Sequence, residues 1–414
     1  MSVGVCIVNK NGLALAADSA GTLSGNNKMV YNSMNKVFSL SRKRPYGVIT
    51  YNNSTILNVS VEQLMKEFRS FLDENEELND FFLIVEKFEE FIETKFKYYM
   101  FEEFEDAPNK ALIKELVVKW GNELKNNYID GDVSSLENII LKYEELVCNS
   151  TRPNVFFDVS DYIKVKYYDY FKMELRVVFS KLCEYDLLVE RVWKCISNYF
   201  NLTLKIEEEK FVGLLFTGYG KDDPFPKYIH IRLSKIIGAK VKYTIVDQYK
   251  ENGDNASIYP VAQSDVISTF CGGISNNLSK YIPKIMDVNV KNKLDKLPKE
   301  IFSQEQINYL KQLFMDTEIV IAKLINEKSI NDEIKPLLTS IQLIQLPDMA
   351  FLAESLVNIT SLKRMYSLNG MQQTVGGPTD VAVISKTEGF IWIKRKHYFD
   401  KDINPDYLQK RGYD

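Results

Sequence analysis

The chain has 414 residues, of which 45% are hydrophobic and 26% are charged, as in ordinary folded proteins. Its 52 Lys and Arg residues against 56 Asp and Glu residues give a net charge of -4, which excludes a broad basic surface for nucleic acid. The sequence also lacks an apolar run of the roughly 20 residues that a bilayer requires, so we expect no membrane partner.

The first 58 residues have the pattern of β-strands. In SVGVCIV both alternating sets of side chains are apolar, which is typical of a strand buried on both faces. The NKNG sequence at residues 9–12 predicts a hairpin turn, and LALAAD is its return strand. A second hairpin is predicted from the strand Lys36–Ser41, a polar turn and VITYNN.

Blocks of helix and strand follow in turn. Residues 59–204 have apolar side chains at helical spacing, and strands return between residues 211 and 250. A second helical stretch covers residues 276–340. The C-terminal part is predicted as a helix, a loop, and the strands VAVISKT and IWIKRKHYF. Such blocks, without βαβ alternation, indicate an α+β fold with antiparallel sheets.

The cysteines and histidines restrict the chemistry. Five scattered cysteines, without CxxC spacing or a signal segment before them, indicate reduced thiols and a cytoplasmic protein. The only histidines, His230 and His397, lie in strand-like stretches, which argues against a Ser-His-Asp triad and a His-rich metal site. GYGK at 218–221 lacks the spacing of a phosphate-binding loop, so we expect neither metal nor cofactor.

Ser2 is the candidate nucleophile. Removal of Met1, which is general when a small residue follows, would leave Ser2 with a free α-amino group. That amine has an ordinary pKa of about 7.7 to 8.0 and is able to take the proton of its own residue's hydroxyl, so no histidine is needed.

Asp18 and Lys36 are the candidate supports of this nucleophile. Asp18 ends the return strand of the first hairpin, and antiparallel pairing brings it back beside the start of the first strand. Lys36 begins the next strand. A lysine near a terminal amine lowers the pKa of that amine by charge repulsion, and a carboxylate holds the lysine in place.

The sequence resembles proteasome β subunits and the related bacterial ATP-dependent peptidase, which are N-terminal-nucleophile hydrolases. The resemblance rests on Ser2, on GLALAADSAGTL, on NKVFSLS and on the C-terminal VGGPTDVAVIS. It covers residues 1–72, 211–275 and 351–395. Ser2, Asp18 and Lys36 fall on the family's catalytic positions, with a two-residue insertion before the lysine.

The resemblance implies a fold, a domain plan and a reaction. The fold is a four-layer αββα sandwich of two antiparallel sheets, formed by one domain over 1–414 with its core at 1–74, 206–275 and 341–414. Helical insertions would occupy 75–205 and 276–340. The reaction is hydrolysis of a peptide or other amide through an acyl-enzyme, with the backbone N–H of Asn52 stabilising the oxyanion.

The sequence departs from the family at several positions. Gln372 and Val375 stand where the family has an accessory Asp and Ser. An accessory serine before the central helix would be Ser268 or Ser275, between which the sequence does not decide. The alternative hypothesis is therefore an inactive scaffold that acts through its helical insertions. A homo-oligomer and a protein partner on those insertions remain open.

Overall fold

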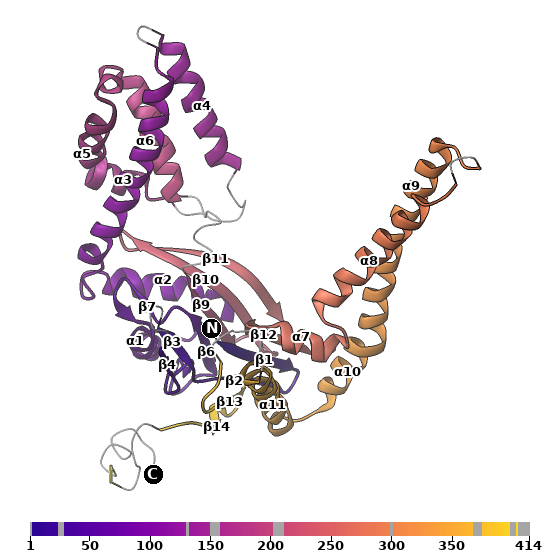
Figure 1. Ribbon diagram of the computed structural model, residues 1–414. Helices are drawn as coiled ribbons and strands as arrows, with labels where there is room; N and C mark the ends of the chain where they lie inside the picture. Colours follow the sequence, from indigo (N-terminus) through magenta and orange to yellow (C-terminus); the bar gives the residue numbers. More distant parts are fainter. Residues whose placement is uncertain are drawn as a thin grey trace. The chain divides into compact units, whose positions relative to one another are not determined.

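The computed structural model describes residues 2–23, 29–129, 132–149, 158–201, 211–298, 301–366, 375–397 and 403–404. The chain divides into two compact units (Figure 1). Unit 1 comprises Met1–Val37, Pro224–Pro226 and Lys250–Asp414, and unit 2 comprises Phe38–Asp223 and Lys227–Tyr249. Each unit contributes one five-stranded sheet.

Unit 1 combines the N-terminal and C-terminal parts of the chain. Its strands are β1 (Val3–Asn9), β2 (Gly12–Ala17), β3 (Gly21–Leu23), β4 (Met29–Tyr31), β12 (Ser257–Ala262), β13 (Asp380–Ser385) and β14 (Gly389–Lys394). Its helices are α7 (Asp265–Gly272), α8 (Asn276–Leu294), α9 (Gln304–Lys328), the π-helix η4 (Ser329–Ile334), α10 (Lys335–Leu343) and α11 (Leu346–Met365).

The sheet of unit 1 has the strand order β12-β1-β2-β13-β14, and all its pairs are antiparallel. Asn9 pairs with Gly12, so Lys10 and Asn11 form a two-residue turn, as the NKNG sequence predicts. Every residue of β1 and β2 is buried. The continuous apolar sequence of these strands therefore corresponds to a sheet that is covered on both faces.

Helix α11 covers one face of this sheet. Its buried residues join a core with one set of alternating side chains from the strands, namely Val3, Val5, Ile7, Ala14, Ala16, Val381 and Val383. The alternate set, which includes Cys6, Leu13 and Leu15, is also fully buried. A one-residue slip would move the side chains that pack under α11 to the opposite face, so the packing of both faces depends on this register.

Unit 2 contains the middle of the chain. Its strands are β5 (Val37–Ser39, which begins at the last residue of unit 1), β6 (Tyr46–Asn52), β7 (Thr55–Ile56), β8 (Val59–Ser60), β9 (Val212–Gly218), β10 (Lys227–Ile237) and β11 (Lys240–Lys250, whose last residue belongs to unit 1). Its helical segments are α1 (Val61–Glu74), the 3-10 helix η1 (Phe81–Leu83), α2 (Ile84–Lys95), α3 (Phe101–Asn127), α4 (Val133–Asn149), α5 (Ser160–Phe179), the 3-10 helix η2 (Ser180–Glu184) and α6 (Asp186–Asn201).

Unit 2 has two hydrophobic cores. In the first, α1 and α2 pack on the sheet β11-β10-β9-β6-β5 through an aromatic group that includes Phe68, Phe88 and Phe216. In the second, α3, α4, α5 and α6 pack on one another around Trp120, Phe171 and Trp193. The helical stretch predicted between residues 59 and 204 is thus a layer on the sheet followed by a separate helical core.

The structure confirms the α+β class with two antiparallel sheets, whereas the stacking of these sheets into four layers and the domain limits stay predictions. Sequence reasoning missed β12 and α7. It also extended the last strand too far, because β14 ends at Lys394 and His397 lies beyond it. Cys6, Cys183, Cys195 and Cys271 are thiols. Within the described ranges, no helix is long and apolar enough to cross a membrane.

Candidate active site

Ser2 lies directly before β1 and is 7% exposed. Its carbonyl accepts the backbone N–H of Gln263 at 3.1 Å. This hydrogen bond continues the β1–β12 ladder one residue beyond the pair of Val3 and Ala262. The backbone of Ser2 is therefore held in the sheet of unit 1.

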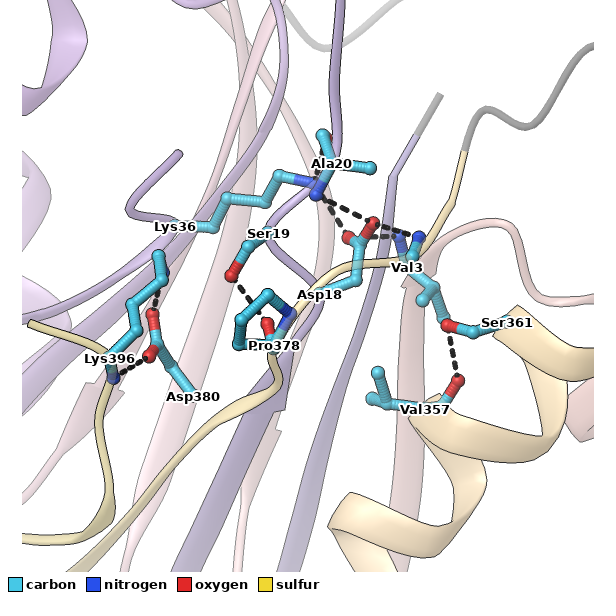
Figure 2. Close-up of polar contacts among 11 residues, drawn as sticks. Val3, Asp18, Ser19, Ala20, Lys36, Val357, Ser361, Pro378, Asp380 and Lys396 are labelled. Carbon is cyan, nitrogen blue, oxygen red and sulfur yellow. Dashed lines mark hydrogen bonds and ion pairs between the residues drawn. The ribbon is translucent and has the colours of Figure 1, made fainter. Parts of the chain in front are cut away.

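Asp18 follows β2 and lies beside the start of β1 (Figure 2). Its N–H donates to the carbonyl of Val3 at 3.1 Å, and the N–H of Val3 donates to its Oδ1 at 3.0 Å. The prediction that the first hairpin returns Asp18 to the start of the chain is correct. The carboxylate therefore binds the residue that directly follows Ser2.

Lys36 completes the predicted charged pair. Its Nζ donates to Asp18 Oδ1 and to the carbonyl of Ala20, both at 2.6 Å. The side chains of Lys36 and Asp18 are 6% and 0% exposed. Since two buried charges without a partner are costly, this ion pair fixes both groups.

The hydrogen bonds to Asp18 limit what it does. Oδ1 accepts from Val3 and Lys36, while Oδ2 accepts the N–H of Ala20 at 3.2 Å and that of Gly376 at 3.1 Å. A carboxylate has about four acceptor positions, so these four donors fill it. Asp18 therefore holds its neighbours in place and is unsuited to take a proton from a serine hydroxyl.

The C-terminal VGGPTD segment packs along Asp18 and Ser19. The Ser19 N–H donates to the carbonyl of Gly376 at 3.1 Å, and its hydroxyl donates to that of Pro378 at 2.5 Å (Figure 2). Gly377 has φ of +75°, and a Cβ there would lie 2.8 Å from the Cβ of Asn32. Glycine is required at this position by both conformation and space.

A second ion pair, between Lys396 and Asp380, lies close enough to influence Lys36 (Figure 2). Asp380 begins β13 and pairs with Ala17, the residue before Asp18. Burial lowers the pKa of Lys36 below its ordinary 10.5, and the ion pair with Asp18 opposes this; Lys396 lowers the pKa further and Asp380 raises it.

Sequence reasoning missed the turn between β12 and α7. Because Gln263 bonds to Ser2, Ser264 is the next residue along the same sheet edge. Arg364 of α11 holds this turn, since its Nε donates to Gln263 Oε1 at 2.8 Å and its guanidinium also binds Asp265. The available signal was a Ser-Asp pair before an apolar helical segment, which is typical of a helix start.

Asn52, the predicted oxyanion donor, ends β6 in unit 2. Its φ is +72°, a left-handed conformation that asparagine adopts more readily than most residues. Its side-chain amide donates to the carbonyl of Phe211 at 2.9 Å, which holds the turn. Its role as a backbone donor to an oxyanion stays a prediction.

The structure describes three of the four accessory positions. Val375 is fully buried in the core beneath α11, and Gln372 lies outside the described residues. Ser275 caps α8 by accepting the N–H of Leu278, and Ser268 lies within α7. Neither serine follows β12 directly; the residue opposite Ser2 in the strand register is Gln263, and Ser264 stands at the N-terminus of α7.

His230 does not belong to this cluster. It lies on β10 in unit 2 and shares a 2.8 Å hydrogen bond with the Tyr51 hydroxyl. Burial, and then the charge of Arg232, lower its pKa to about 4. The imidazole is therefore a neutral structural group at pH 7. Among the described residues, no group of His, Cys, Asp and Glu has the arrangement of a metal site.

In the comparisons with known proteins, likeness is found among solved structures. No protein-family model and no curated protein matches the chain. Among solved structures, the chain is similar to Anbu (ancestral beta-subunit) from Yersinia bercovieri. The TM-score is 0.27 and the identity 11%, over 99% of this chain and 94% of that one. A likeness at this score carries no argument about activity.

Proposed function

We propose that the chain is an N-terminal-serine hydrolase of the proteasome-related kind, which cleaves peptide or other amide bonds with Ser2 as its nucleophile. The observation that carries the proposal is the double role of the Asp18 carboxylate. It binds the N–H of Val3 and the ammonium of Lys36 at once, and so ties a buried positive charge to the residue that follows Ser2.

The reaction begins once Met1 is removed. The α-amine of Ser2 takes the hydroxyl proton while Oγ attacks the substrate carbonyl, and the same proton then passes to the leaving nitrogen. The acyl group remains on Oγ as an ester, which water hydrolyses. Lys36 lowers the pKa of the amine by charge repulsion, so that more of it is neutral at pH 7.

The proposal includes the fold and the oxyanion donor. We infer that the two sheets stack as a four-layer sandwich with its core at 1–74, 206–275 and 341–414, and that the backbone N–H of Asn52 stabilises the oxyanion. Support comes from the apolar, buried second face of β1 and β2 and from the helices that cover one face of each sheet. The left-handed conformation of Asn52 suits a sharp turn at that position.

A non-catalytic scaffold is the second candidate. The observation in its favour is Val375, because a fully buried apolar side chain provides no hydrogen bond to an N-terminal amine. In that case Ser2→Ala would leave the biological role unchanged, whereas replacement of residues 75–205 by a short linker would remove it.

Labelling with an electrophilic probe for N-terminal nucleophiles tests the proposal. Wild-type protein should be modified at Ser2, Ser2→Ala should not react, and Ser2→Thr should retain labelling because it keeps the hydroxyl. Lys36→Met should slow labelling by at least tenfold at pH 7. Equal labelling of wild type and Ser2→Ala would reject the proposal.

A further inference from the structure

Helices α8 and α9 of unit 1 pack against each other (Figure 1). Each of them exposes a stripe of apolar side chains. On α8 the stripe consists of Leu278, Tyr281, Ile285 and Val288, which are between 38% and 58% exposed. On α9 it consists of Tyr309, Leu313, Val320 and Leu324, which are between 51% and 67% exposed. Both spacings place four side chains on one side of a helix.

These stripes are distinct from the contact within the hairpin. Among the residues of the hairpin whose side chains the structure describes, the buried ones are Pro283 and Leu294 on α8 and Ile307 on α9. Pro283 and Leu294 lie about half a helical turn away from the α8 stripe at 3.6 residues per turn. The stripe on α8 therefore lies on the side of the helix opposite to its buried residues.

The two helices carry opposite charges. Helix α8 contains four lysines and one aspartate, while α9 with η4 contains six acidic residues and three lysines. Some of the minority charges are paired internally, since Asp287 binds Lys291 and Asp332 binds Lys328. The surplus is positive on α8, which includes the exposed Lys280 and Lys284, and negative on α9.

We propose that the hairpin is an interface between copies of this chain, in which the α8 stripe of one copy packs on the α9 stripe of another. Each stripe offers apolar side chains, and the positive surplus of one helix meets the negative surplus of the other. A second copy is the partner that supplies both complementary surfaces. The inference is independent of the proposed activity of Ser2.

The molar mass in solution, measured by sedimentation over a range of concentrations, tests this interface. Wild-type protein should associate to a multiple of the single chain, and the limiting multiple shows whether the contact closes as a dimer or a larger ring. Leu313→Gln with Leu324→Gln should raise the concentration for half-association at least tenfold. The matched control, Val165→Gln with Leu187→Gln, changes two residues of unit 2 that are 91% and 83% exposed and should leave the association unchanged.

Charge reversal distinguishes specific pairing between copies from non-specific hydrophobic association. Lys280→Glu with Lys284→Glu should weaken association, as should Glu305→Lys with Glu327→Lys, and an equimolar mixture of these two variants should associate through the restored α8–α9 charge pairing. Far-UV circular dichroism confirms that each variant is folded. A wild type that remains a single chain at all concentrations, or stripe variants that associate like the control, would overturn the proposal and leave the stripes to a different partner.

Discussion

At the scale of single residues, the Asp18–Lys36 pair is the feature on which the candidate site depends. The position of Asp18 followed from the sequence because a two-residue turn fixes where β2 ends relative to β1, whereas Lys36 was assigned through the family resemblance. The contacts of Gly376 and Arg364 could not be predicted from the sequence. Each of them joins residues that are about 100 or more positions apart, and no local sequence pattern relates such residues. The sequence thus predicted the charged pair but not its surroundings.

Replacement of Asp18 by asparagine should destabilise the protein strongly. The change keeps the shape but leaves the Lys36 ammonium buried without a counter-charge, which costs about 3 to 5 kcal/mol. The matched control is Asp106→Asn, which removes an exposed partner of Lys110 and should cost less than about 1 kcal/mol. Urea unfolding measures both. Equal losses would show that the buried pair contributes no more than a surface pair.

The lowered pKa of Lys36 predicts a pH dependence of stability. Between this pKa and the ordinary 10.5, the unfolded chain holds a proton that the folded chain has released, so the free energy of unfolding rises with pH. Below this window Lys36 is protonated in both states, so the free-energy cost of burying its charge is present in full. In urea unfolding from pH 7 to 10.5, wild type should gain stability relative to Lys36→Met. If the difference in the free energy of unfolding between wild type and Lys36→Met stayed constant or fell with pH, the lowered pKa of Lys36 would be contradicted.

At the scale of elements, regular patterns were readable and irregular ones were not. The first hairpin was predicted by alternating apolar residues around a turn sequence. Strand β12 was missed because Pro260 lies within it, which is unusual for a strand, and because most of its residues are only partly buried. It is an edge strand of the sheet, where proline is tolerated. With β12 unrecognised, the position of Gln263 beside Ser2 was not predictable.

His230 on β10 should make the protein less stable in acid. Its pKa of about 4 lies below the unfolded value of 6.5, so between these values the unfolded chain binds the proton first and stability falls as the pH falls. The maximum loss is about 3 kcal/mol, as the shift and 1.36 kcal/mol per pKa unit require. The free energy of unfolding of His230→Gln, measured from pH 7 to 4, should not show this decrease with falling pH. Identical slopes for both proteins would refute the prediction.

At the scale of the whole molecule, helical periodicity located both helical stretches, but it contained no information on how they pack. The structure divides the first stretch between helices on a sheet and a separate core, and it makes the second a hairpin with exposed stripes. Packing of this kind depends on contacts between segments far apart in sequence, which one sequence without relatives does not reveal.

Excision of the α8–α9 hairpin should leave the rest of unit 1 folded. The Ser329 hydroxyl donates to the carbonyl of Gly272 at 2.6 Å, so the two ends of the hairpin meet. A chain with residues 274–327 replaced by a short Gly-Ser linker should retain labelling at Ser2 and remain a single chain in solution. A folded product that has lost labelling would show that the hairpin contributes to the site.

The central claim is that Ser2 becomes the N-terminal residue and acts as a nucleophile. Intact-mass spectrometry of the purified protein, before and after reaction with the electrophilic probe, tests it most directly. The account predicts a mass without Met1 and a single adduct that fragmentation places on Ser2. Quantitative retention of Met1 in protein that hydrolyses amides, or an adduct on another residue, would contradict it.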